Sequence, residues 1–236
     1  MPATFAPGPD ATEELELDDI TMIAAISKVH SLIEARKPHP GRLRLVLLLS
    51  GLAVVAAAGL FWLPGAVVGH ALRVVPVEKR VEIGQRVLSD VFRVSGAACA
   101  APEGREALAR LDARLGTNGG GIIVLASGLD GARLLPGGTV LVGRTLVEDQ
   151  PAPDALAAQV LAERARATQA DPLATLLRWT GVRSAFALLT TGDLPEHSIV
   201  GYAEYLLTTP GVPATAEDLR TTFADASVPL AAYARA

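Results

Sequence analysis

The feature that most constrains this chain is a long run without any charged residue. No charge occurs from Leu45 to Leu72, and Leu45 to Leu63 reads LVLLLSGLAVVAAAGLFWL. About 20 apolar residues, each rising 1.5 Å in a helix, are needed to cross the ~30 Å hydrocarbon layer of a bilayer. A cleaved signal peptide has a much shorter leading region than the 44 residues found here. A core helix with no polar face would be unusual in so small a protein. The sequence therefore predicts a transmembrane segment over residues 45–72, with Phe61 and Trp62 at an interface.

This segment divides the chain into an N-terminal tail (1–44), the span (45–72) and a C-terminal domain (73–236). Positive charges are almost equally frequent on both sides of the span, but Arg42 and Arg44 directly abut its N-terminal end. The positive-inside rule then favours an N-in, C-out orientation. The heavy use of Ala, Arg, Leu and Gly is typical of a GC-rich bacterium. We therefore expect a single-pass protein of the inner (plasma) membrane, in contact with membrane lipid, with a periplasmic C-terminal domain.

Composition excludes one partner class and leaves the redox compartment open. The net charge is −4, and 21 basic and 25 acidic residues are mixed along the chain. Without a basic face, nucleic acid is not an expected partner. The only cysteine, Cys99, cannot form an intrachain disulfide, and we expect it to be a small buried thiol.

The N-terminal tail combines a Pro- and Ala-rich start with a helical pattern. Residues 1–12 are expected to be disordered. Residues 13–36 are expected to form a helix, because acidic side chains come first and basic ones last, as suits the helix dipole. An imperfect apolar stripe fits either a partner-binding or membrane-surface helix or a solvated juxtamembrane helix, and the solvated one is favoured. Residues 38–41, Pro-His-Pro-Gly, are expected to break the helix before the span.

The C-terminal domain alternates helical and extended patterns. Helices are expected over 78–94 and 103–115, the second ending at Gly116. Strands are expected over 122–125 and 139–142. Further helices are expected from Asp154, a plausible cap, to about Thr168, then over 172–190 and 197–208. Helices, a small sheet and more helices make an α+β domain.

Three stretches of this domain resemble a known family. Residues 134–142 read LLPGGTVLV, residues 154–157 read DALA, and residues 160–166 read VLAERAR. Over about residues 78–210, the chain resembles the membrane-associated zinc metallopeptidases of the HtpX and CAAX-protease type, metallopeptidase family forty-eight. The resemblance implies a zincin-like domain, a zinc cofactor, and an LPGG strand beside the substrate cleft. It therefore implies that Leu135, Pro136, Gly137 and Gly138 contact a peptide.

The residues that would hold the zinc are missing. In the HExxH motif of such enzymes, two histidines on one helix face bind zinc and the glutamate polarises the bound water. The matching positions here are Ala162, Glu163 and Arg166, and Ser198 falls in the region of the acidic third ligand. A methyl group has no lone pair, and a guanidinium brings a permanent positive charge. Only one histidine, His197, follows the span. We therefore expect no metal site and no cofactor.

Glu163 is thus the remnant of a catalytic base. Without a metal to lower the pKa of water, a lone carboxylate is a poor hydrolase. Two interpretations remain, a residual catalytic group and a charge on the helix surface paired with Arg164 or Arg166, and the second is favoured.

Three functions follow as expectations. The first is a catalytically inactive pseudopeptidase that binds a protein or peptide partner. The second is an active zinc metalloendopeptidase with an atypical site. The third is a structural membrane anchor that acts through its N-terminal helix.

Overall fold

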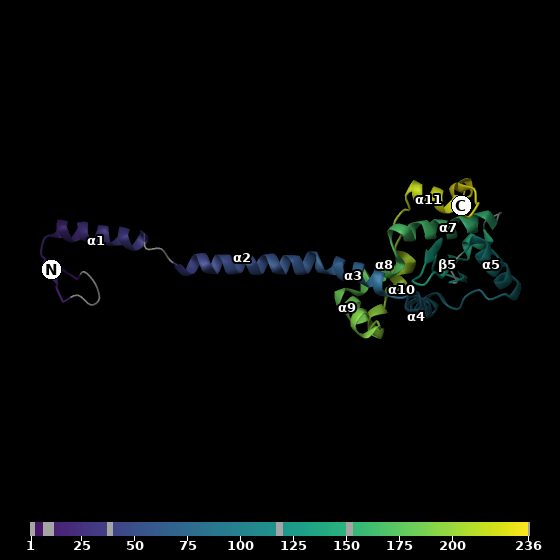
Figure 1. Cartoon of the computed structure of the whole chain (residues 1–236), viewed down its shortest axis with the longest axis horizontal. Helices are drawn as coiled ribbons and strands as arrows, with labels where there is room; N and C mark the ends of the chain where they lie inside the picture. The colour runs from purple at the N-terminus through teal and green to yellow at the C-terminus, as the bar shows by residue number, and fades with distance from the viewer. Residues whose placement is uncertain (1–2, 7–11, 37–39, 117–119, 150–152, 236) are drawn as a thin grey trace. The chain divides into compact units, whose positions relative to one another are not determined.

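The computed structural model describes residues 3–6, 12–36, 40–116, 120–149 and 153–235. The chain forms two compact units, Met1–Ala57 and Ala58–Ala236 (Figure 1).

The first unit contains a short hairpin and two helices. Strands β1 (Ala3–Phe5) and β2 (Leu15–Leu17) pair in antiparallel fashion, and helices α1 (Ile20–Arg36) and α2 (Pro40–Phe61) follow. The expectation of disorder is wrong for residues 3–5, and residues 7–11 lie outside the described part. The predicted helix over 13–36 begins only at Ile20, because residues 15–17 pair with β1 and the Asp19 carboxylate accepts the Thr21 N–H at 2.9 Å.

The predicted break at 38–41 is also shifted. Pro38 and His39 lie outside the described residues, whereas Pro40 and Gly41 already belong to the first turn of α2. Proline is tolerated there, since the first N–H groups of a helix have no partner within it. The break is thus shorter than the Pro-His-Pro-Gly pattern indicates.

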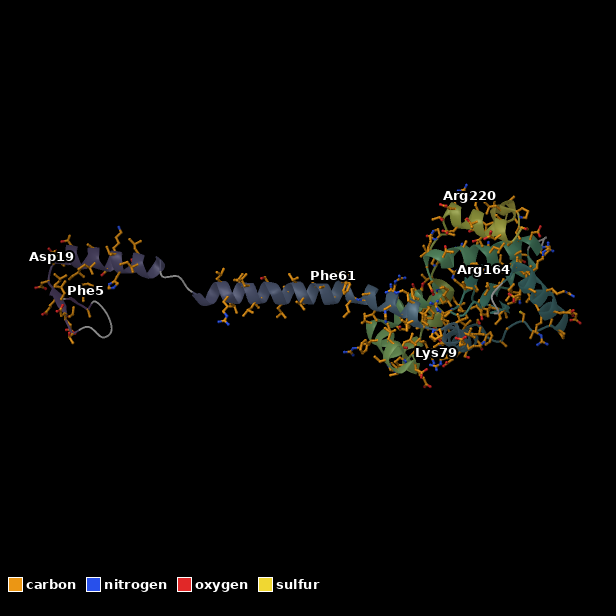
Figure 2. All side chains as sticks on the ribbon, viewed as in Figure 1. Phe5, Asp19, Phe61, Lys79, Arg164 and Arg220 are labelled. Carbon is orange, nitrogen blue, oxygen red and sulfur yellow. The ribbon has the colours of Figure 1, made fainter. Side chains whose placement is uncertain are left out.

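Helix α2 carries the membrane-spanning pattern. Leu43–Phe61 has a mean hydropathy of 2.2, and none of its residues is buried. Among the described residues, it is the one helix long and apolar enough to cross a membrane. Side chains project from it on all sides, Phe61 among them (Figure 2). Phe61 is 82% exposed and Trp62 is 72% exposed, which is compatible with the expected interfacial position.

The second half of the charge-free run does not belong to this span. Helix α3 (Leu63–Val74) begins immediately after Trp62, with a proline in its first turn, and buries Val68 and Ala71. It packs against α8 (Pro172–Thr180) and α9 (Val182–Thr191). The predicted boundary at residue 72 therefore lies inside the folded second unit, and the exposed apolar helix ends at Phe61.

The second unit has the expected α+β organisation. After α3 come α4 (Val77–Ser95) and α5 (Pro102–Leu115), and then strands β3 (Ile122–Leu125), β4 (Ala132–Leu134) and β5 (Val140–Gly143). The remaining elements are α6 (Thr145–Glu148), α7 (Pro153–Gln169), α8, α9, η1 (Glu196–Ile199), α10 (Tyr202–Thr208), α11 (Ala216–Asp225) and η2 (Leu230–Arg235). The helices predicted over 172–190 and 197–208 are each divided in two, at Gly181 and at Val200–Gly201, where the glycines adopt positive φ.

The sheet has the order β3–β5–β4. Strand β5 pairs parallel with β3 and antiparallel with β4, so β4 is an edge strand. Alternate residues of β5 face opposite sides: Leu141 joins a core with α3, α4, α8, α9 and α10, while Val140 and Val142 join a core with α5, α7 and α11. Figure 1 shows α7 and α11 on one side of β5 and α4 on the other. The sheet is thus covered by helices on both faces.

The LPGG segment forms the turn between β4 and β5. The Leu135 N–H donates to Thr139 O at 2.8 Å, and the Gly138 N–H donates to Leu135 O at 3.1 Å. This turn lies directly against α4: a Cβ on Gly84 would come 2.0 Å from Pro136 O, and one on Gly137 would come 2.5 Å from the Val81 Cα. Both glycines are therefore required by close backbone packing, and Gly137 also has a φ of 85°.

Candidate functional site

A cavity of about 130 Å³ lies at the β4 edge of the sheet. It is bounded by β4, α7, α8, α10 and the segment that follows α10. Its charged and aromatic lining residues are Arg133, Glu163, Arg166, Tyr202 and Tyr205. Because these residues come from three separate elements, only the tertiary fold brings them together.

Glu163 is the buried centre of this group. It projects from α7, whose other buried residues are apolar, and only 5% of it is exposed. Its Oε1 contacts the Arg166 guanidinium one turn further along α7, and the Arg133 Nη1 lies 3.7 Å away. The expectation that Glu163 is a surface charge is therefore wrong, because strand β4 and the C-terminal segment η2 pack against α7. Its expected partner Arg166 is present, but Arg164 donates instead to Leu115 O and Gly116 O, at the end of α5.

Burial raises the pKa of Glu163 above its usual value of 4.5. The charges of Arg166 and Arg133, together with hydrogen bonds from Arg166 and from the Leu134 backbone, oppose this shift in the pKa. Burial is the larger effect, so ionisation of Glu163 is disfavoured even with two cations nearby.

Arg133 connects the sheet to α10. Its Nε donates to Leu206 O at 3.3 Å and its Nη2 to Thr209 O at 2.9 Å, both at the C-terminal end of α10. The last carbonyls of a helix have no partner within it and carry partial negative charge, so a guanidinium is favourable there. The third donor, Nη1, bonds Ala132 O at 2.8 Å. Arg133 is thus held in place from three directions.

Arg166 connects α7 to the C-terminal segment. Its Nη1 donates to Glu163 and its Nη2 to the Tyr233 hydroxyl at 3.2 Å, within η2. Its Nε is buried without a hydrogen-bond partner among the described residues. The two arginines and Glu163 therefore tie β4, α7, α10 and η2 into one network.

The same network occupies the outer edge of β4. In the antiparallel pair with β5, the N–H and C=O groups of Ala132 and Leu134 point away from β5, since residues 131 and 135 bond the partner strand. Ala132 O accepts from Arg133, and the Leu134 N–H donates to Glu163. An extended peptide could not add to these groups without displacing both side chains.

The four residues predicted to contact a peptide do not line the cavity. Leu135 and Pro136 are buried, and Gly137 and Gly138 pack against α4 and Gly120. Their neighbour Leu134 does line the cavity. A peptide-binding role of the LPGG residues stays a prediction.

Zinc does not fit the residues present. Ala162 is fully buried within α7, and Arg166 carries a positive charge into the cavity beside Glu163. Ser198 lies in η1, where its hydroxyl donates to Pro195 O at 2.6 Å, and it is not among the cavity residues. In the described ranges, no group of three or more His, Cys, Asp or Glu side chains could hold a metal ion. A dication beside two guanidinium groups would be repelled rather than bound.

Sequence reasoning missed the aromatic wall of the cavity. Tyr202 and Tyr205 stand one turn apart on α10, with ring centroids 5.9 Å apart, and Trp179 of α8 packs edge-on to Tyr202 at 5.4 Å. Tyr202 is buried, which raises its pKa well above the usual range, while Tyr205 is 37% exposed. Their spacing of three residues on one helix face was the only signal of this wall in the sequence.

Cys99 corrects another expectation. It is exposed, in the segment between α4 and α5, and its N–H donates to Val124 O at 2.9 Å. The backbone of this segment pairs with β3, so the side chain is left outside. Cys99 is therefore an accessible thiol rather than a buried one.

Comparisons with known proteins leave the family open. No family model matches this sequence, and no curated protein matches it either. The metallopeptidase resemblance therefore stays a prediction, carried by the LPGG and AERAR motifs alone.

Proposed function

We propose that this chain is a membrane-anchored, non-catalytic binding protein, a pseudopeptidase whose zincin-like domain presents the β4-edge cavity to a protein or peptide partner. The observation that carries the proposal is the state of Glu163. At the position where the resemblance places a catalytic base, this carboxylate is bound by a guanidinium and flanked by a second one at 3.7 Å.

This arrangement is unfavourable for hydrolysis. A general base needs a free acceptor atom directed at water, and a hydrolytic metal needs lone-pair donors around it. Glu163 instead accepts hydrogen bonds from Arg166 and from the Leu134 backbone. The second candidate, an active zinc metalloendopeptidase, has no observation in its favour and is not pursued.

The cavity is better suited to binding a protein or peptide partner. Tyrosine and arginine are the side chains that most often carry binding energy at protein interfaces, where they offer large contact areas with polar ends. Here they line a cavity that remains partly open, next to Val212, which is 56% exposed. Because two of the outer backbone groups of β4, Ala132 O and the Leu134 N–H, already have partners, we expect a binding partner to insert a side chain or chain end into the cavity rather than to add a strand.

Photo-crosslinking in the full chain tests this proposal. A benzophenone amino acid at Val212, beside the cavity, should give a discrete crosslinked band in the native membrane. Filling the cavity through Ala167→Trp on α7 should abolish the band. The matched control Ala109→Trp, at an exposed position of α5 that does not line the cavity, should leave it unchanged. A band that survives Ala167→Trp, or the absence of any band, would contradict binding in this cavity.

The orientation of the anchor belongs to the same proposal. Arg42 and Arg44 next to the span support a cytoplasmic N-terminus and a periplasmic C-terminal domain. The single exposed thiol, Cys99, makes this testable without any mutation. A membrane-impermeant maleimide should label it in cells whose outer membrane has been permeabilised. Labelling that requires disruption of the inner membrane would reverse the orientation.

One observation supports the alternative in which the chain is a structural anchor acting through its N-terminal helix. Several large apolar side chains of α1 are more than half exposed. Deleting residues 1–36 should then remove the cellular phenotype, whereas deleting the outer domain should not. The opposite result would favour the cavity-binding proposal.

A further inference from the structure

Helix α1 has one apolar face and one polar face. At spacings of three and four residues, Met22, Ile26, Val29 and Ile33 follow one another along a single face, which Ala25 and Leu32 widen. Ser27, Lys28 and Ser31 lie on the opposite face together with Ile20, and Ile23 lies at the border between the two faces. The stripe thus continues over about three turns.

This face is exposed in the structure. Met22 is 56% exposed, Val29 55% and Ile33 53%, and a shallow apolar hollow runs over Ala25, Ile26, Val29, His30 and Ile33. Side chains of this size are seldom left in water as a continuous stripe. Something outside the described chain is therefore expected to cover them.

The sequence around the helix indicates that the surface of a bilayer covers this apolar face. Only residues 37–39 separate the end of α1 at Arg36 from the start of α2 at Pro40. Four Cα–Cα steps reach at most roughly 15 Å, so the C-terminal end of α1 is tethered close to the start of the candidate span at Leu43. A helix held at this distance is always near the lipid headgroups.

The charge distribution fits the same partner. Cations outnumber the one acidic residue, Glu34, at the tethered end, where they occupy positions 36, 37, 42 and 44, and Lys28 lies on the polar face. Acidic residues gather at the far end, at positions 13, 14, 16, 18 and 19. Anionic headgroups attract juxtamembrane cations and hold the basic end of α1 at the surface, while the acidic residues of the hairpin, which precede α1, stay in water.

We propose that α1 lies in the plane of the membrane, with the face of Met22, Ile26, Val29 and Ile33 inserted among lipid headgroups and its Lys28 face in water. The inference does not depend on the cavity-binding function, because it concerns the other unit of the chain. It assigns the tail a lipid-binding role next to the span.

Fluorescence quenching on the full chain tests this proposal. A single cysteine at Val29 (apolar face) or at Ser31 (polar face), in a Cys99→Ser background, is labelled with an environment-sensitive dye. The protein is reconstituted in vesicles of phosphatidylcholine and phosphatidylglycerol. We expect lipid-attached nitroxide to quench the label at position 29 several-fold more than the label at 31, and aqueous iodide to show the reverse preference.

Three results would overturn the proposal. Equal iodide access at both positions would mean a solvated helix. Protection of position 29 from both quenchers would mean that a second copy or another protein covers this face. The additional variant Ile33→Asp should release the helix and make the label at position 29 accessible to iodide, and no such change would also count against lipid insertion.

Discussion

Replacing Glu163 with alanine should destabilise the second unit strongly. The substitution leaves Arg166 and Arg133 facing each other without their shared carboxylate, although their side chains are only 21% and 15% exposed. Removing one partner of a buried ion pair typically costs about 3–5 kcal/mol. We take the lower end, about 3 kcal/mol, because burial already disfavours the ionised carboxylate and because Arg133 retains three backbone acceptors.

A fluorescence melt in detergent measures this effect. Trp179 packs against Tyr202 in the same unit and reports its unfolding, once Trp62 is replaced with phenylalanine. For a unit of this size, a loss of about 3 kcal/mol corresponds to a midpoint shift of roughly 6–12 °C. Glu163→Gln keeps an acceptor for the Leu134 N–H and should fall between wild type and Glu163→Ala.

The control is an ion pair with little burial. Glu106 and Arg110 on α5 are both 71% exposed, so Glu106→Ala should leave the midpoint almost unchanged. If Glu163→Ala behaves like Glu106→Ala, the network at the β4 edge does not stabilise the fold as argued. A smaller loss in Glu163→Ala/Arg166→Leu than in Glu163→Ala alone would show that the unpaired guanidinium is the source of the cost.

Three further predictions follow. Folding raises the pKa of Glu163, so the free energy of unfolding of wild type relative to Glu163→Gln should fall as the pH rises from about 4.5 through the pKa of the folded state. Above that pKa the difference should level off, and urea titrations at several pH values measure it. A difference that grows with pH would mean that folding lowers the pKa instead. Gly137→Ala should destabilise the unit by at least about 2 kcal/mol, because its Cβ would meet the α4 backbone. The control Gly104→Ala in α5 should be neutral or stabilising by up to about 1 kcal/mol. Similar melting temperatures for the two variants would refute the close packing of Gly137. The purified full chain should contain far less than one zinc per molecule and melt at the same temperature with and without a chelator; a stoichiometric metal would refute the assignment of the site.

The sequence predicted those parts of the fold that depend on local patterns. Helices α4 and α5, strands β3 and β5 and the start of α7 fall close to their predicted bounds, because periodicity and the Gly116 stop are read within a few residues. The divided helices were missed because a single glycine, such as Gly181, is tolerated within a helical pattern, and only packing decides whether the chain turns there.

For the candidate site, the sequence predicted the identity of some residues but not their arrangement. The sequence indicated that Glu163 has no zinc ligands beside it, and Arg166 was correctly named as a possible partner. Its burial, and the part played by Arg133, were not predicted. The hydrogen bond from Arg133 to Thr209 O joins residues 76 positions apart, and no spacing rule reaches that far.

The sequence by itself determined the exposed apolar helix, the α+β order of elements and the absence of zinc-donor atoms at positions 162 and 166. Hydropathy, periodicity and donor atoms belong to each residue wherever it lies. What the tertiary structure decided was burial and partnership. It placed α3 in the folded unit although its sequence continues the charge-free run, it left Cys99 outside, and it enclosed Glu163 between two arginines. Those outcomes depend on which surfaces meet, and such contacts exist only after the chain has folded.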